Sequence, residues 1–194
     1  KNDESEYLAE ALRSVIVNQS VKPDQVILVV DGELTVELTD EVTKWDDQYP
    51  ELDVVWLKYN VGLSNAMNEG LKHCKHELVF RMDSDDVAAP NRFSLQIEAF
   101  DKNPSASMIG GYYRQFDQVM KNEVGSRLLP LLPKEIKLYS NRRTPINHVT
   151  IGFKLADIIE VGGYPDTRLP FEDWWLAMRF ISAKKNIINI PEYL

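Results

Sequence analysis

Cysteine is almost absent from this sequence, because Cys74 is the only one. A single thiol excludes an internal disulfide and permits a reducing compartment. No apolar run approaches the roughly 18 residues that span a membrane, and no secretory signal is visible. Basic residues are fewer than acidic ones: the sequence has 22 Lys and Arg and 30 Asp and Glu, which gives a net charge of −8. This charge argues against a protein that binds nucleic acid.

The 194 residues, 44% of them hydrophobic, suffice for one α/β domain with a sizeable core. In the first half, apolar runs predict strands at 25–30, 53–58 and 77–82. Helical spacing predicts helices around 7–16, 35–49, 63–71 and 91–100, with Thr35 capping the second and Pro90 in the first turn of the last. This alternation indicates a parallel sheet with right-handed crossovers.

The second half predicts a strand at 107–116 with a glycine kink, a loop at 118–133 and a short helix at 134–139. A strand at 149–153, a turn at 162–165, a helix at 171–181 and a strand-like end at 186–194 follow. No linker or repeat divides the chain. We expect a single domain that is incomplete at its start, because the sequence opens directly into a helix.

The stretch from Glu77 to Asp86 organises the rest of the sequence. Its apolar run predicts a strand buried on both faces, which ends at Asp83, Asp85 and Asp86. Carboxylates this close repel one another unless a cation, water or a hydrogen-bond donor neutralises them. Hard oxygen ligands on a tight turn suit Mg²⁺ or Mn²⁺. The alternative is a solvated acidic loop in which one Asp caps the next helix.

A second buried strand ends at Asp31, which we expect at the same sheet edge as Asp83. Asp31 suits a contact to a base or ribose, or else it holds the backbone of its own turn. Gly62 and Asn65 lie where a helix begins, and the unpaired N–H groups there can bind phosphate. Any helix start offers the same feature.

Two acids, Glu172 and Asp173, open the last predicted helix. They either interact with the helix dipole or supply a general base for a bound hydroxyl. The adjacent Trp174 can line a sugar site or face the core.

Three further residues have two interpretations each. His148 can contact phosphate or metal, or satisfy a hydrogen bond in the core. Arg142 and Arg143 can meet a diphosphate, or remain solvated surface arginines.

These motifs, taken in order, resemble family 2 glycosyltransferases, most closely the bacterial branch that builds capsule, exopolysaccharide or O-antigen. The resemblance covers most of the chain and rests on Asp31-Gly32, Asn60-Val-Gly-Leu63, Arg81-Met-Asp-Ser-Asp-Asp86, Pro90-Asn-Arg92, Asn147-His148, Gly162-Gly-Tyr164 and Phe171-Glu-Asp-Trp-Trp175.

The resemblance implies a GT-A fold, a Rossmann-like three-layer sandwich with a mostly parallel central sheet. It implies a UDP-sugar donor, a saccharide or lipid-linked saccharide acceptor, Mn²⁺ or Mg²⁺, and inversion at the anomeric carbon. Transferred to this sequence, Asp31 contacts uracil, Asp83 the ribose region and the metal, Asp85 the metal, and Asp173 is the base with Glu172 beside it. Gly62, Asn65 and Arg81 complete the expected nucleotide site.

The same resemblance implies a cytoplasmic enzyme at the inner face of the membrane, and a catalytic domain over 1–194 that lacks its first strand and a C-terminal extension. Glu33 departs from the family pattern. A sugar-nucleotide pyrophosphorylase and a non-catalytic domain that binds a nucleotide sugar or a glycan are the alternative functions.

Overall fold

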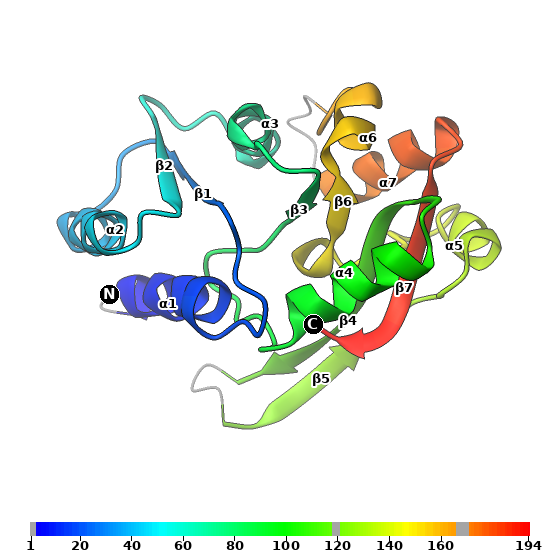
Figure 1. Cartoon of the computed structure of the whole chain (residues 1–194), viewed down its shortest axis with the longest axis horizontal. Helices are drawn as coiled ribbons and strands as arrows, with labels where there is room; N and C mark the ends of the chain where they lie inside the picture. The colour runs from blue at the N-terminus through cyan, green and yellow to red at the C-terminus, as the bar shows by residue number, and fades with distance from the viewer. Residues whose placement is uncertain (1–2, 118–120, 166–170) are drawn as a thin grey trace.

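A computed structural model describes residues 3–117, 121–165 and 171–194 (Figure 1). The first half contains α1 (Asp3–Leu12), a π-helical turn (Arg13–Val17), β1 (Val26–Asp31), α2 (Val36–Gln48), β2 (Leu52–Leu57), α3 (Leu63–His73), β3 (Leu78–Phe80) and α4 (Arg92–Lys102). The second half contains β4 (Ala106–Phe116), β5 (Glu123–Arg127), α5 (Pro133–Tyr139), a 3₁₀ turn (His148–Thr150), β6 (Gly152–Lys154), α6 (Leu155–Glu160), α7 (Glu172–Ser182) and β7 (Asn186–Tyr193).

The helices follow the predicted periodicity closely. Thr35 caps α2 by accepting a hydrogen bond from the Leu38 N–H at 3.3 Å, and α2 ends two residues before Pro50. Pro90 lies just outside α4, which begins at Arg92 with Asn91 as its N-cap. Local sequence therefore determines most helix boundaries to within two residues.

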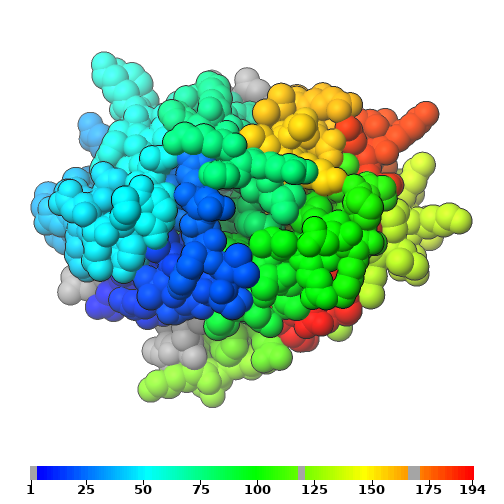
Figure 2. Space-filling view, viewed as in Figure 1, coloured from blue at the N-terminus to red at the C-terminus, as the bar shows by residue number. Residues whose placement is uncertain are grey.

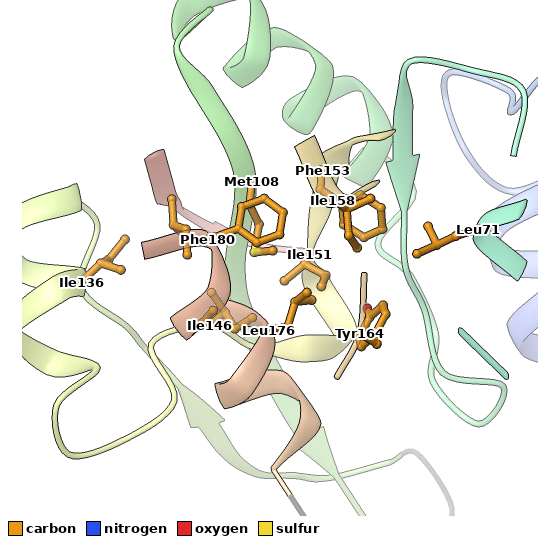
Figure 3. Packing of buried hydrophobic residues seen from close by; sticks show 12 residues of the cluster. Leu71, Met108, Ile136, Ile146, Ile151, Phe153, Ile158, Tyr164, Leu176 and Phe180 are labelled. Carbon is orange, nitrogen blue, oxygen red and sulfur yellow. The ribbon is translucent and has the colours of Figure 1, made fainter. Parts of the chain in front are cut away.

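The main core lies between the five-stranded sheet and helices α3, α5, α6 and α7. Figure 3 shows its members converging from these elements, among them Met108 on β4, Phe153 on β6 and Phe180 on α7. Tyr164 belongs to the same cluster and is 1% exposed. Burial of this apolar surface holds α7 against the sheet.

The strand pairing corrects the expectation of one mostly parallel sheet. β1 pairs with β2 in parallel, and this pair forms a sheet of its own. The second sheet has the order β3-β6-β4-β5, with β7 also pairing with β4. Only β4 and β7 are parallel within it, because β6 and β5 run antiparallel to their neighbours. The fold is α/β with a mixed sheet.

A groove separates β1 from β3, and we call it the interstrand groove. Its cavity of about 740 Å³ is lined by Leu28 of β1, Phe80 of β3, Leu12 of α1 and Leu71 of α3, and it reaches Asp31 and Asp83. The space-filling view shows a recess between the blue N-terminal segments and the green ones (Figure 2). β3 is accordingly half-buried, whereas the sequence predicted burial on both faces.

Two further expectations were wrong in detail. Residues 118–120 of the predicted loop at 118–133 lie outside the described residues. The rest of it contains β5, a largely exposed strand that is held by pairing with Tyr113–Phe116 of β4. The predicted strand at 149–153 begins as a 3₁₀ turn, because the N–H of Thr150 donates to the Asn147 carbonyl at 2.9 Å. β6 then leads directly into α6, which periodicity did not reveal. In the part of the chain that the structure describes, no helix has both the length and the apolarity needed to cross a bilayer.

Candidate active site

The candidate site is an open cleft of about 1410 Å³, which we call the acidic cleft. Its walls come from α1, the turn after β3, the β4–β5 hairpin, the 3₁₀ turn and the start of α7. Asp85, Asp86, His148 and Asp173 all line it. Since Asp83 lines the interstrand groove, the acidic turn lies between the two cavities.

The acidic turn brings three carboxylates together. Oxygen atoms of Asp83, Asp85 and Asp86 lie within 4.8 Å of one another. Burial raises the pKa of Asp86, and the nearby charges of Asp83 and Asp85 raise it further. A divalent cation would relieve this repulsion, and hard carboxylate oxygens are the ligands that Mg²⁺ and Mn²⁺ prefer. The cluster fits the expected metal site and adds Asp86 to it.

The backbone pairing of β3 with the β6 segment continues one residue past Phe80, to Arg81. The Arg81 N–H donates to the Ile151 carbonyl at 2.9 Å, and the N–H of Asp86 then donates to the Asp83 carbonyl at 3.4 Å, which closes the turn. The Arg81 guanidinium is buried and forms an ion pair with Asp83. Its Nε and Nη1 have no hydrogen-bond partner among the described residues.

A second buried arginine, Arg92, holds the backbone at the start of this turn. Its Nη2 donates to the Arg81 carbonyl at 2.6 Å, and its Nε donates to Gln96 Oε1 at 3.1 Å. Burial, followed by the charge of Arg81, lowers the pKa of Arg92 to about 9. Sequence reasoning recorded Arg92 in a motif but gave it no role. Its position six residues after Asp86, on the buried face of α4, was the available signal.

Asp31 joins the end of β1 to the start of α3. Its Oδ1 accepts from the Val61 N–H at 2.7 Å, and its Oδ2 accepts from the Gly62 N–H at 3.0 Å. Asp31 therefore holds the backbone of the neighbouring loop rather than that of its own turn. Gly62 has φ of 85°, a conformation that suits glycine. Asn65 is exposed on the first turn of α3, and its Nδ2 donates to the Val61 carbonyl at 3.0 Å.

The first turn of α7 carries the other two acids. Asp173 lines the acidic cleft, and its Oδ1 accepts from the Trp174 N–H at 2.7 Å. Glu172 Oε1 lies 3.9 Å from His148 Nδ1. Burial, followed by the charge of Arg81, lowers the pKa of His148 to about 3, so its ring is neutral at neutral pH. The 3.9 Å between Glu172 Oε1 and His148 Nδ1 is longer than a direct hydrogen bond.

Three other candidate residues, Trp174, Arg142 and Arg143, lie outside both cavities. The Trp174 indole N–H donates to the Ser140 carbonyl at 2.8 Å, which directs the ring toward the end of α5. Arg142 and Arg143 are exposed in the loop after α5. None of the three is among the residues that line the acidic cleft or the interstrand groove.

Comparisons with known proteins agree with this geometry. A profile of the family described as "Glycosyl transferase family 2" matches residues 1–160. The chain is 35% identical to a UDP-Gal:alpha-D-GlcNAc-diphosphoundecaprenol beta-1,3-galactosyltransferase of Escherichia coli, over 97% of this chain and 67% of the relative. It is 32% identical to the amylovoran biosynthesis glycosyltransferase AmsE of Erwinia amylovora, over 99% of this chain and 70% of the relative.

Two solved structures share the fold. A mannosyltransferase from Pyrobaculum calidifontis, in complex with GDP-Man and Mn²⁺, has a TM-score of 0.74 and 17% identity, over 97% of this chain and 52% of that one. S. aureus TarS in complex with UDP has a TM-score of 0.73 and 20% identity, over 98% of this chain and 55% of that one. The chain thus spans about half the length of these two structures.

Proposed function

Because the chain belongs to glycosyltransferase family 2, we propose that it transfers a sugar from a UDP-sugar to a saccharide acceptor, with inversion, in the synthesis of a bacterial surface polysaccharide. The observation that carries this proposal is the position of the acidic turn. It lies between two cavities, and its Asp85 and Asp86 line the acidic cleft together with Asp173. Sugar transfer needs an ionic contact for the leaving diphosphate and a separate base for the acceptor.

Asp83, Asp85 and Asp86 would hold Mg²⁺ or Mn²⁺. The ion, when bound, supplies positive charge that stabilises the departing diphosphate. Asp83 is also the residue expected near the ribose, and its ion pair with Arg81 fixes it at the boundary of the interstrand groove. The mannosyltransferase with Mn²⁺ supports a divalent ion in this fold.

The UDP moiety would lie on the side of Asp31, Gly62 and Asn65. Asp31 would accept from the uracil ring with lone pairs that its two backbone contacts leave free. Gly62 contributes by its backbone conformation, since its N–H is already donated to Asp31. Asn65 would supply a donor to the nucleotide, as would Nε and Nη1 of Arg81, which have no hydrogen-bond partner among the described residues.

Asp173 would act as the general base. It lines the cleft, whereas Glu172 turns toward His148, as expected for neighbours on a helix, which point about 100° apart. The acceptor hydroxyl would transfer its proton to the Asp173 carboxylate as it attacks the anomeric carbon from the face opposite the diphosphate.

The acceptor would be a lipid-linked saccharide, as the name of the E. coli relative indicates for that enzyme. The cytoplasmic face of the membrane would then be the site of action. Arg142 and Arg143, both exposed, would meet the diphosphate of such an acceptor outside the cleft. A contact between Trp174 and the acceptor has the least support, because the indole N–H already donates to the Ser140 carbonyl.

A screen of UDP-sugars tests this proposal on the full-length protein, with and without Mn²⁺, in the presence of lipid-diphosphate saccharide acceptors. We expect metal-dependent release of UDP and a β-linked or otherwise inverted product. Release of pyrophosphate from UTP and a sugar phosphate would instead identify a pyrophosphorylase. UDP binding without turnover of any donor would identify a binding domain, and either result overturns the proposal.

A further inference from the structure

Tyr164 and His148 form a buried pair beneath the acidic cleft. The Tyr164 hydroxyl lies 3.0 Å from His148 Nε2, and the ring centroids are 5.5 Å apart. Tyr164 is among the most deeply buried residues of the main core, where Figure 3 shows it in the cluster that contains Leu176. Neither ring has a role in the donor or acceptor contacts proposed above.

The contact between the two rings determines which nitrogen of His148 carries the proton. Burial raises the pKa of Tyr164 and outweighs the opposing charge of Arg81, so the hydroxyl keeps its proton. A buried hydroxyl needs an acceptor for that proton, and His148 Nε2 is the one that the described residues provide. Nε2 must then be unprotonated, and a neutral ring carries its proton on Nδ1.

Nδ1 is the nitrogen on the side of Glu172. The 3.9 Å that separates it from Glu172 Oε1 exceeds a direct hydrogen bond but suits one bridging water or a small movement of the carboxylate. An Nδ1–H group attracts this carboxylate, whereas an unprotonated Nδ1 would repel it. The tautomer thus decides whether Glu172 is held on the His148 side.

The turn that carries Tyr164 is fixed at several points. Asn68 of α3 clamps the Tyr164 backbone, because its Oδ1 accepts from the N–H at 2.8 Å and its Nδ2 donates to the carbonyl at 2.9 Å. Arg179 of α7 donates to the carbonyls of Gly162 and Gly163 at 2.7 and 2.9 Å. Gly163 has φ of 67°, and a Cβ there would lie 2.5 Å from Asn68 Oδ1. These contacts leave the hydroxyl little freedom to turn away from His148.

We propose that Tyr164 is a positioning residue, which fixes His148 with its proton on Nδ1 so that Glu172 is held back and Asp173 alone faces the acceptor. The assignment of the tautomer depends only on the contact between Tyr164 and His148, whereas its effect on sugar transfer rests on the proposed function. Through Asn68 the same turn joins α3, at the nucleotide side, to α7, at the acceptor side. The Gly162-Gly163-Tyr164 turn thereby acquires a role in catalysis.

Nitrogen-15 NMR of the imidazoles tests the tautomer directly. The sequence has three histidines, so labelling histidine alone gives few signals, and a His148→Gln spectrum assigns the relevant one. We expect the Nδ1-protonated pattern in the wild type. Tyr164→Phe removes the donor to Nε2 and should shift His148 toward the Nε2-protonated form. Tyr112→Phe, which alters a tyrosine outside both cavities, should leave the signal unchanged. An Nε2-protonated wild type overturns the proposal whatever the protein catalyses.

Two substitutions of His148 separate positioning from packing. Asn places an amide N–H where Nδ1–H lies, whereas Gln places a carbonyl oxygen where Nε2 accepts from Tyr164. We expect His148→Asn to keep most of the kcat and His148→Gln to lose about 10- to 100-fold, the usual scale for a residue that orients a catalytic group. The KM for the donor should be unchanged in both. A greater loss in Asn than in Gln would show that His148 only satisfies Tyr164. Absence of transfer by the wild type would refute the proposed function and leave the NMR result valid.

Discussion

The carboxylate of Asp31 accepts the Gly62 N–H at 3.0 Å and the adjacent Val61 N–H at 2.7 Å, so one side chain connects the end of β1 with the start of α3. The sequence had offered two interpretations of Asp31, a nucleotide contact and a structural turn residue. The geometry shows that a structural role exists and leaves lone pairs free for a ligand.

Replacing Asp31 should therefore have two separable effects. Asp31→Ala removes both backbone contacts, and we expect a loss of about 1 kcal/mol in the free energy of unfolding, as for other side-chain caps. If the carboxylate also contacts uracil, binding of UDP and UMP should weaken alike. Denaturant titration and calorimetry measure the two effects, with the exposed neighbour Glu33→Ala as control. Weaker UDP binding with unchanged UMP binding would contradict a base contact.

Metal dependence should reside in the acidic turn. In the wild type we expect UDP to raise the melting temperature more with Mn²⁺ than with EDTA. Asp85→Ala should remove that difference, because the cluster loses one of its three carboxylates. Asp101→Ala, which removes an exposed carboxylate at the end of α4, serves as the control and should keep it. Equal shifts in Mn²⁺ and EDTA for the wild type would count against the metal site.

Asp173→Asn should abolish most transfer without affecting the donor. An amide keeps the shape of the side chain but cannot accept a proton near neutral pH, so the rate should fall about a hundredfold or more. UDP affinity should not change. Glu135→Gln, which also removes an acid from the first turn of a helix, controls for the helix dipole. A fully active Asp173→Asn enzyme with lower stability would show that the acid only interacts with its helix.

The folded protein should lose stability on acidification, in part through His148. Its pKa is lowered to about 3 in the folded chain, by burial and then by Arg81, and lies near 6.5 when unfolded. As the pH falls below 6.5 the unfolded chain takes up a proton that the folded chain does not, so the folded state is increasingly disfavoured until about pH 3. Tyr164 and Glu172 face the same ring.

We expect the loss of stability between pH 6.5 and 3 to be smaller in His148→Gln than in the wild type. Urea denaturation across this range measures it. His76→Gln, which removes an exposed histidine, should follow the wild-type curve. If the free energy of unfolding of His148→Gln falls with pH as steeply as that of the wild type, other groups cause the acid sensitivity.

Sequence reasoning succeeded where the signal was local. Apolar periodicity located most helices, and the acidic residues after β3 indicated the cluster before any contact was known. It failed where distant segments decide the structure. β5 is polar and exposed, so only its pairing with β4 makes it a strand. Arg92 and Tyr164 are held by distant partners, Ile151 and Asn68 respectively, which composition does not reveal.

The separation of β1 from β3 was not foreseen, because both strands are apolar and were assigned to one sheet. The structure instead places them in two separate sheets, with the interstrand groove between them. The donor sugar and the acceptor depend on loop shapes that one sequence does not specify.

The groove between β1 and β3 also has a kinetic consequence. Among the described residues, no strand lies beside the edges of β1 and β3 that face the groove, so their amides have no neighbouring strand to accept their hydrogen bonds, whereas β4 is paired with β5, β6 and β7. In deuterated water the groove-facing amides of β1 and β3 should exchange early, and those of β4 and β7 late. The residues beside the proposed nucleotide site would then be the ones that open most readily, and the rest of the sheet would act as the rigid frame.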